Sequence, residues 1–381
     1  MSNVRMAGLI VVLMSLFTTA VRASDMIEAV NLLPETYRPA AVRQLAIAED
    51  NQPQLIEAIR RLKPEHRAAI GFLIEHMPEH DLKALTADFL VENVELAYQA
   101  RAEVSWGKDL PDELFFEYVL PYANVNERRD NWRRQFYEQF IGVAKECKTP
   151  GEAMVRLNAE AFKFYGVSYH PTKRPKPDQS PFETIEAKYA SCTGLSIMLI
   201  DICRAVCVPA RFVGTPSWTQ TRGNHSWVEG FDRQWNYIGA CEGGGLNSGW
   251  FVGNAAAADP DHPMHRIYAA SYKQTNMHFP LVWKMRSTEV PAHNITHFYT
   301  QRRPVKFTFL GEGDQPIDAV ITVYHDGAIA AHGAISAEAE PFLIAGGQTY
   351  TVTIQAGSER IQQKVTVPND EQPVVVLRKD A

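Results

Sequence analysis

Two residues of this chain have a type and a position that indicate catalysis, a cysteine before an apolar helix and a histidine before a strand. Cys192 precedes the apolar run TGLSIMLIDICRAV, and free N–H groups and the dipole at a helix start favour negative charge. We therefore expect a lowered pKa for this thiol, with Ser191 or Thr193 as the helix cap. His225 heads the strand HSWVEGF and is expected to exchange a proton with the thiol.

The segment around these two residues resembles the core of the transglutaminase-like superfamily, a group of papain-like thiol enzymes. The resemblance rests on SCTGLSIMLIDICRAVCVPARFVG, GNHSWVEGF and QWNYIGA, and it covers about residues 189–253. Arg204 and VPAR at 208–211 match the family pattern, whereas Cys207 stands where the family has glycine. A looser likeness lies upstream in LPYANVNERRDNWR.

The resemblance implies a papain-like core in which Cys192 is the nucleophile and His225 is the general base and acid. The family's acid lies four residues after the tryptophan of the next strand, and counting from Trp235 leads to Gly239. Our candidate for the acid that orients the imidazole is Glu242, in the run GACEGG. Three further residues are alternatives: Asp259, Asp261 and Asn247.

Hydrophobic periodicity predicts an α+β chain of three regions. Residues 24–164 have apolar side chains at three- and four-residue spacing, typical of a helical N-terminal region. Residues 165–302 contain a buried helix followed by short antiparallel strands, the expected transglutaminase-like core. Residues 303–381 alternate apolar and polar, which predicts a β-sandwich of immunoglobulin or transthyretin type. Prolines between 171 and 181 predict a surface loop that either borders a substrate cleft or only connects elements.

The N-terminus predicts export. Arg5 precedes an apolar run at 6–20, and a small-residue pattern ends at Ala23, so residues 1–23 are expected to be a cleaved signal peptide. An uncleaved membrane anchor is the alternative. Removal of the peptide takes away two arginines and no acid, which changes the net charge from −6 to −8. This charge, without a basic block, argues against a nucleic-acid partner, and we expect a secreted or periplasmic protein.

The other cysteines matter because a disulfide to one of them would make the Cys192 thiol unavailable as a nucleophile. The chain has five cysteines: Cys147, Cys192, Cys203, Cys207 and Cys241. An odd number in an exported chain leaves at least one thiol unpaired within the chain, and Cys203 and Cys207 are expected to be packing thiols on one helix. A disulfide from Cys192 to Cys147 or Cys241 would remove the nucleophile.

Other motifs predict neither a cofactor nor a metal site. HNITH at 293–297 has the histidine spacing of a zinc helix but Asn294 where the glutamate base would stand. DPDHPMH at 259–265 is expected to be a solvated loop rather than a cation site. Three tryptophans are expected either to pack in the core or to line the cleft: Trp218, Trp227 and Trp250.

The favoured function is an exported cysteine enzyme that attacks an amide carbonyl and forms a thioester. Water needs no dedicated site, so hydrolysis as a peptidase or amidase is preferred to cross-linking. The substrate would be a peptide, a protein side-chain amide or a cell-wall peptide, and the C-terminal domain would contact the cell surface. The alternative is a non-catalytic binding scaffold on a degenerate core, which the absence of an acid at Gly239 favours.

Overall fold

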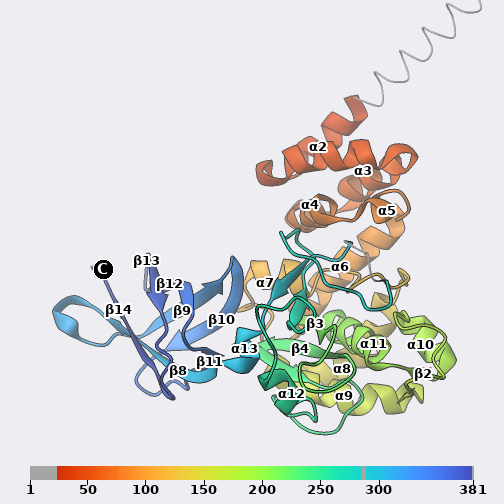
Figure 1. Ribbon diagram of the computed structural model, residues 1–381. Helices are drawn as coiled ribbons and strands as arrows, with labels where there is room; N and C mark the ends of the chain where they lie inside the picture. The colour runs from red at the N-terminus through yellow and green to blue at the C-terminus, as the bar shows by residue number, and fades with distance from the viewer. Residues whose placement is uncertain (1–23, 285–288, 380–381) are drawn as a thin grey trace, which may run out of the picture. The chain divides into compact units, whose positions relative to one another are not determined.

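The computed structural model describes residues 24–284 and 289–379, and it combines helices with antiparallel sheets (Figure 1). The predicted α+β class, with helices near the N-terminus and strands near the C-terminus, is confirmed. The chain divides into two compact units, one ending at Ala102 and the other beginning at Glu103. The predicted signal peptide lies outside the described residues. Within those residues, every helix is too short or too polar to cross a lipid bilayer.

The first unit consists of short helices. In α3, Leu55 and Ile59 are buried on one face while Arg60 and Arg61 lie in the last turn, the pattern of an amphipathic helix. Proline occupies the first turn of α2 and of α3, where its missing N–H is not needed. The elements are η1 (Glu35–Tyr37), α2 (Arg38–Ile47), η2 (Glu49–Asn51), α3 (Gln52–Arg61), η3 (Pro64–His66), α4 (Arg67–His76), α5 (Glu79–Leu82) and α6 (Ala87–Glu103).

In the second unit, helices pack around the buried helix α11. Every residue of α11 after Cys192 is buried, as expected for a helix that is hydrophobic on every face. Helix α9 begins at the Thr149 cap and ends at Gly166, whose φ of 62° favours glycine. The helices are α7 (Asp112–Tyr118), α8 (Arg133–Lys145), α9 (Pro150–Tyr165), α10 (Pro181–Ala187), α11 (Cys192–Ala205), α12 (Val252–Ala256) and α13 (His297–Thr300).

A nine-stranded sheet lies beside α11, with the order β13-β12-β9-β10-β5-β4-β3-β6-β7. Strands β3, β4 and β5 are antiparallel neighbours, and α11 packs against β4 (Figure 1). A short parallel pair, β1 with β2, precedes α11. The strands of this part are β1 (Ser168–Tyr169), β2 (Tyr189–Ala190), β3 (Ala210–Thr215), β4 (His225–Asp232), β5 (Gln234–Ile238), β6 (Tyr268–Ala270) and β7 (Ala292–Asn294).

The C-terminal strands form a sandwich that shares the nine-stranded sheet. A second sheet, β11-β8-β14, packs on it through a core that includes Phe307, Phe342 and Val352. Strand β10 pairs with β5, and the Trp235 indole donates to the Ile329 carbonyl at 2.8 Å. The elements are β8 (Arg302–Leu310), η4 (Glu312–Asp314), β9 (Ala319–His325), β10 (Ala328–Ile335), β11 (Phe342–Ala345), β12 (Thr349–Ala356), β13 (Glu359–Thr366) and β14 (Val374–Arg378).

Candidate active site

Cys192 is the first residue of α11, as predicted from the sequence. Ser191 occupies the N-cap position, but its hydroxyl donates to the Pro177 carbonyl at 3.4 Å and does not cap the helix. The Thr193 hydroxyl lies 3.3 Å from the Ser226 hydroxyl. The predicted side-chain cap is therefore absent, and these two hydroxyls instead tie the start of the helix to its neighbours.

The thiol of Cys192 is free and faces the start of β4. Burial raises its pKa, whereas the backbone N–H groups of Ser226 and Thr193 lower it, and burial has the larger effect. The predicted lowering of the thiol pKa is therefore wrong, because the loss of hydration outweighs the helix N–H groups. Ser226 directly follows His225, so the thiol lies beside the residue next to the candidate histidine.

Aromatic rings surround His225. Its ring centroid lies 4.7 Å from that of Trp250, 5.0 Å from Phe251 and 5.7 Å from Trp227. Burial among these rings lowers the pKa of His225 to about 4, and no described residue forms a hydrogen bond with its Nε2 atom. Trp218 and Trp227 are buried, whereas Trp250 is 62% exposed. Two of the three tryptophans therefore pack inside the molecule, and Trp250 covers the imidazole from the solvent side.

The carboxylate of Glu242 occupies the space where a side chain at position 239 would lie. A β-carbon built on Gly239 would overlap this carboxylate. Asn158 of α9 holds the turn by donating to the carbonyls of Gly239 and Glu242, both at 3.0 Å. Glu242 accepts a hydrogen bond from the Trp250 indole at 3.0 Å. Among the described residues, no hydrogen bond joins Glu242 to His225, so the imidazole meets Trp250 and not the acid itself.

The three alternative orienting residues make local contacts. The Asn247 side-chain amide donates to the Asn236 side chain at 2.8 Å, and the Asn247 side-chain oxygen accepts from the backbone N–H of Tyr237 at 3.3 Å. Asp259 accepts from the backbone N–H of Asp261 at 2.9 Å. These bonds stabilise their own loops.

A buried ion pair supports the aromatic shell from behind. Arg211 donates to Glu229 at 2.8 Å, and both side chains are 3% exposed. Tyr299 donates to the other oxygen of Glu229 at 2.5 Å and accepts from the Trp227 indole at 2.7 Å. The arginine of VPAR and the tryptophan and glutamate of HSWVE thus form one chain of contacts that ends beside His225.

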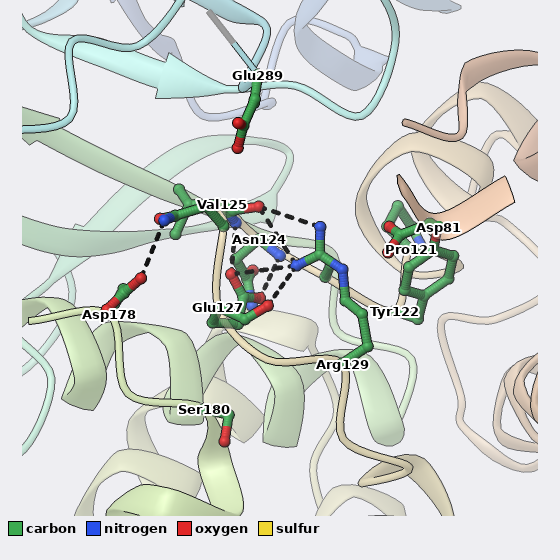
Figure 2. Close-up of polar contacts among 12 residues, drawn as sticks. Asp81, Pro121, Tyr122, Asn124, Val125, Glu127, Arg129, Asp178, Ser180 and Glu289 are labelled. Carbon is green, nitrogen blue, oxygen red and sulfur yellow. Dashed lines mark hydrogen bonds and ion pairs between the residues drawn. The ribbon is translucent and has the colours of Figure 1, made fainter. Parts of the chain in front are cut away.

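The loop within LPYANVNERRDNWR, the segment with the looser upstream likeness to the family, contacts α11. Figure 2 shows the Glu127 carboxylate under this loop, where it accepts from the N–H groups of Asn124 and Val125 at 2.6 and 2.8 Å. The Asn124 amide donates at 2.8 Å to Asp201, which lies within α11. Burial raises the pKa of Asp201 well above its usual range. The loop therefore holds the helix that carries Cys192.

Two residues that the sequence analysis did not single out, Tyr169 and Arg174, interact electrostatically with Cys192. Tyr169 is 56% exposed, and its pKa is raised by burial and by the nearby charges of Cys192 and Glu242. The charge of Arg174 lowers the pKa of both Cys192 and Tyr169, against the larger effect of burial. The basic run TKRPK before Cys192 was the available sequence signal for Arg174.

The histidines of HNITH and the other cysteines do not form a further site in the described residues. His293 lies in β7 and His297 begins α13, so the two histidines of HNITH do not share a helix. Over 24–284 and 289–379, no group of three potential ligands is arranged to hold a metal ion. In the described part of the chain, the five cysteines form no disulfide with one another. Cys207 has a φ of 63°, the left-handed conformation that favours glycine, which explains why glycine suits this position.

Comparisons with known proteins agree with this core. Residues 141–252 match the family model of the transglutaminase-like superfamily, which confirms the predicted resemblance for that segment. A solved structure from Cytophaga hutchinsonii, named "Putative Cysteine Protease", is 17% identical with a TM-score of 0.27. The match covers 61% of this chain and 66% of that one, which is just under two thirds of its length. No curated protein matches the chain.

Proposed function

We propose that this protein is an exported cysteine enzyme that hydrolyses amides, with Cys192 as nucleophile and His225 as general base and acid. The observation that best supports this is a free thiol at the first turn of α11, facing the residue next to a histidine whose Nε2 is unpartnered. The family match over 141–252 supports a thiol-enzyme core. Export rests on the N-terminal sequence pattern alone.

The resting pair is neutral near pH 7, because burial raises the thiol pKa and lowers that of the imidazole. Nε2 of His225 accepts the thiol proton while sulfur bonds to the carbonyl carbon and the carbonyl electron pair moves to oxygen. Backbone N–H groups at the start of α11 stabilise that oxyanion. As the C–N bond breaks, His225 returns the proton to the amine. His225 then takes a proton from water, whose oxygen displaces the thiolate, and the thiolate regains that proton.

Glu242 is proposed as a positioning residue that acts through Trp250. Its carboxylate fills the space of the side chain that the family has at position 239 and holds the indole packed on His225. A fixed indole restricts the imidazole to the rotamer in which Nε2 can accept the thiol proton. In related triads the orienting group contributes about 10⁴-fold in rate, and an indirect contact should contribute less.

Release of the acyl group to water is proposed in preference to cross-linking. Water is present at high concentration and needs no binding site, whereas an amine acceptor does. The preferred substrates are therefore peptides or side-chain amides that are cleaved.

The test is turnover of an amide panel by the wild type, Cys192→Ser and His225→Ala. We expect each variant to lose about 10³-fold or more in kcat, while Cys147→Ala, a change at another buried thiol, retains activity. Activity that persists in Cys192→Ser would contradict the proposal.

A non-catalytic scaffold is the second candidate, favoured because no carboxylate of residues 24–284 or 289–379 is hydrogen-bonded to His225. It predicts that iodoacetamide fails to modify the folded protein and that no amide in the panel is turned over. Selective alkylation of Cys192, slowed by His225→Ala, would count against the scaffold.

A further inference from the structure

The proline-rich loop at 170–179 is fastened to the segment that leads into the candidate nucleophile. Strand β1 pairs with β2, Tyr169 with Ala190, and β2 ends two residues before Cys192. The backbone N–H of His170 donates to the Ala190 carbonyl at 2.9 Å. At the other end of the loop, Pro177 accepts from the Ser191 hydroxyl at 3.4 Å. The loop is therefore held beside the thiol at both ends.

Two cations on this loop lack an acidic partner in the described part of the chain. The Lys173 ammonium lies 5.4 Å from the centre of the Tyr189 ring. Arg174 donates through Nε to the Pro171 carbonyl at 3.0 Å, which leaves its two terminal nitrogens available.

The acids near the loop are already occupied. Asp178, which Figure 2 labels, accepts from the Asn126 amide at 2.9 Å. Glu183 binds Lys176 at 3.0 Å and lies 3.8 Å from Arg128. Neither acid neutralises the two free cations.

The surroundings of the cations suit the acyl part of a substrate. Tyr169 and Tyr189 present rings that are 56% and 37% exposed. The charge of Arg174 acts on both Cys192 and Tyr169, and the loop that carries Arg174 is fastened at both ends to the segment that leads into Cys192. Glu242 is the acid on this side, and it is engaged with Trp250. The site thus carries the positive charge of the loop beside an acid that is already bound to an indole.

We propose that the loop at 170–179 is a subsite for acyl donors that carry a carboxylate close to the scissile amide, with Arg174 as the cation that pairs with it. This inference rests on the proposed function of Cys192. Lys173 adds a second positive charge, and the two tyrosine rings cover the adjoining apolar part of the donor. A carboxylate approaching this acidic protein would otherwise meet repulsion, so a local pair of cations decides which amides reach the thiol. The carboxylate comes from a peptide C-terminus or from an acidic side chain.

The first test uses two reagents that differ by one charge. Iodoacetate and iodoacetamide both alkylate thiols, and the ratio of their rates at Cys192 reports the local charge without requiring turnover. We expect Arg174→Gln to lower the iodoacetate to iodoacetamide ratio about fivefold, the size of a partly exposed charge contact. The matched control is Lys176→Gln, which removes a cation already bound to Glu183 and should leave the ratio unchanged.

Two results would overturn the subsite. An unchanged ratio in Arg174→Gln shows that Arg174 does not sense the carboxylate, and equal losses in both variants show a general surface-charge effect. If neither reagent modifies Cys192, the thiol is inaccessible and the proposed function fails as well. Alkylation with an unchanged ratio contradicts the subsite alone.

The second test identifies the source of the carboxylate. Peptide amides are compared with a free or amidated C-terminus, and with glutamate or glutamine beside the scissile bond. We expect the wild type to prefer one acidic form through KM, and Arg174→Gln to lose about fivefold of that preference with little change in kcat. Equal kcat/KM for all four peptides in the wild type would refute the subsite.

Discussion

Replacing Gly239 by alanine should disable the proposed positioning contact without touching the thiol or the imidazole. The backbone of Gly239 is not in the left-handed region, so alanine is tolerated there. The three atoms nearest to the new β-carbon belong to the Glu242 carboxylate, the flexible end of a long side chain. The carboxylate should therefore move away and release the Trp250 indole from its 3.0 Å hydrogen bond.

The expected loss follows from that one hydrogen bond. A bond to a charged acceptor contributes about 1.5–3 kcal/mol, and the exposure of Trp250 reduces this to about 1–2 kcal/mol. Since 1.4 kcal/mol corresponds to about tenfold in rate, kcat/KM should fall about five- to thirtyfold. Glu242→Ala should cause a loss of the same size, because it removes the same bond.

The assay is a double-mutant cycle on kcat/KM. Gly239→Ala combined with Glu242→Ala should be no worse than either change alone, because both act on one contact. Gly243→Ala is the control, since a β-carbon at Gly243 meets no atom within 4 Å. Losses that multiply in the double variant, or full activity in Gly239→Ala, would refute the role of Glu242.

The site and its support lead to two further predictions. The rate should fall as pH drops through about 4, because His225 becomes protonated there and stops accepting the thiol proton. Trp250→Ala should hydrate the imidazole and so move this acidic fall in rate to higher pH. A pH–rate profile in which the fall stays at the same pH would show that the indole does not desolvate the imidazole. Glu229→Gln should destabilise the fold by about 3–5 kcal/mol in urea unfolding, because it leaves Arg211 buried without its charged partner. Glu146→Gln, a change at an exposed ion pair, should leave the urea midpoint unchanged. Equal urea midpoints for the two variants would be inconsistent with a structural role for the buried pair.

Local patterns were sufficient to predict the elements that carry the candidate residues. The apolar run after Cys192 predicted a buried helix, and the alternation after His225 predicted a strand, because both signals depend on neighbouring residues. The proline-rich run likewise predicted the surface loop between β1 and α10.

Properties that depend on distant residues were not predictable. The pKa of Cys192 is set by burial under several elements, and the helix start alone gave the wrong sign. The contact from Glu242 to Trp250 requires the chain to turn back on itself after β5. The pairing of β10 with β5 joins strands almost a hundred residues apart, so no local pattern indicates that the sandwich continues the central sheet.

The central claim is that sulfur of Cys192 becomes covalently acylated with His225 as its proton acceptor. Intact-protein and peptide mass spectrometry after rapid mixing with an activated amide tests it most directly. We expect an acyl adduct on Cys192 that forms in the wild type, forms far more slowly in His225→Ala, and is absent in Cys192→Ser. Substrate cleavage with no adduct on Cys192, or an adduct of equal rate without the imidazole, would contradict the account.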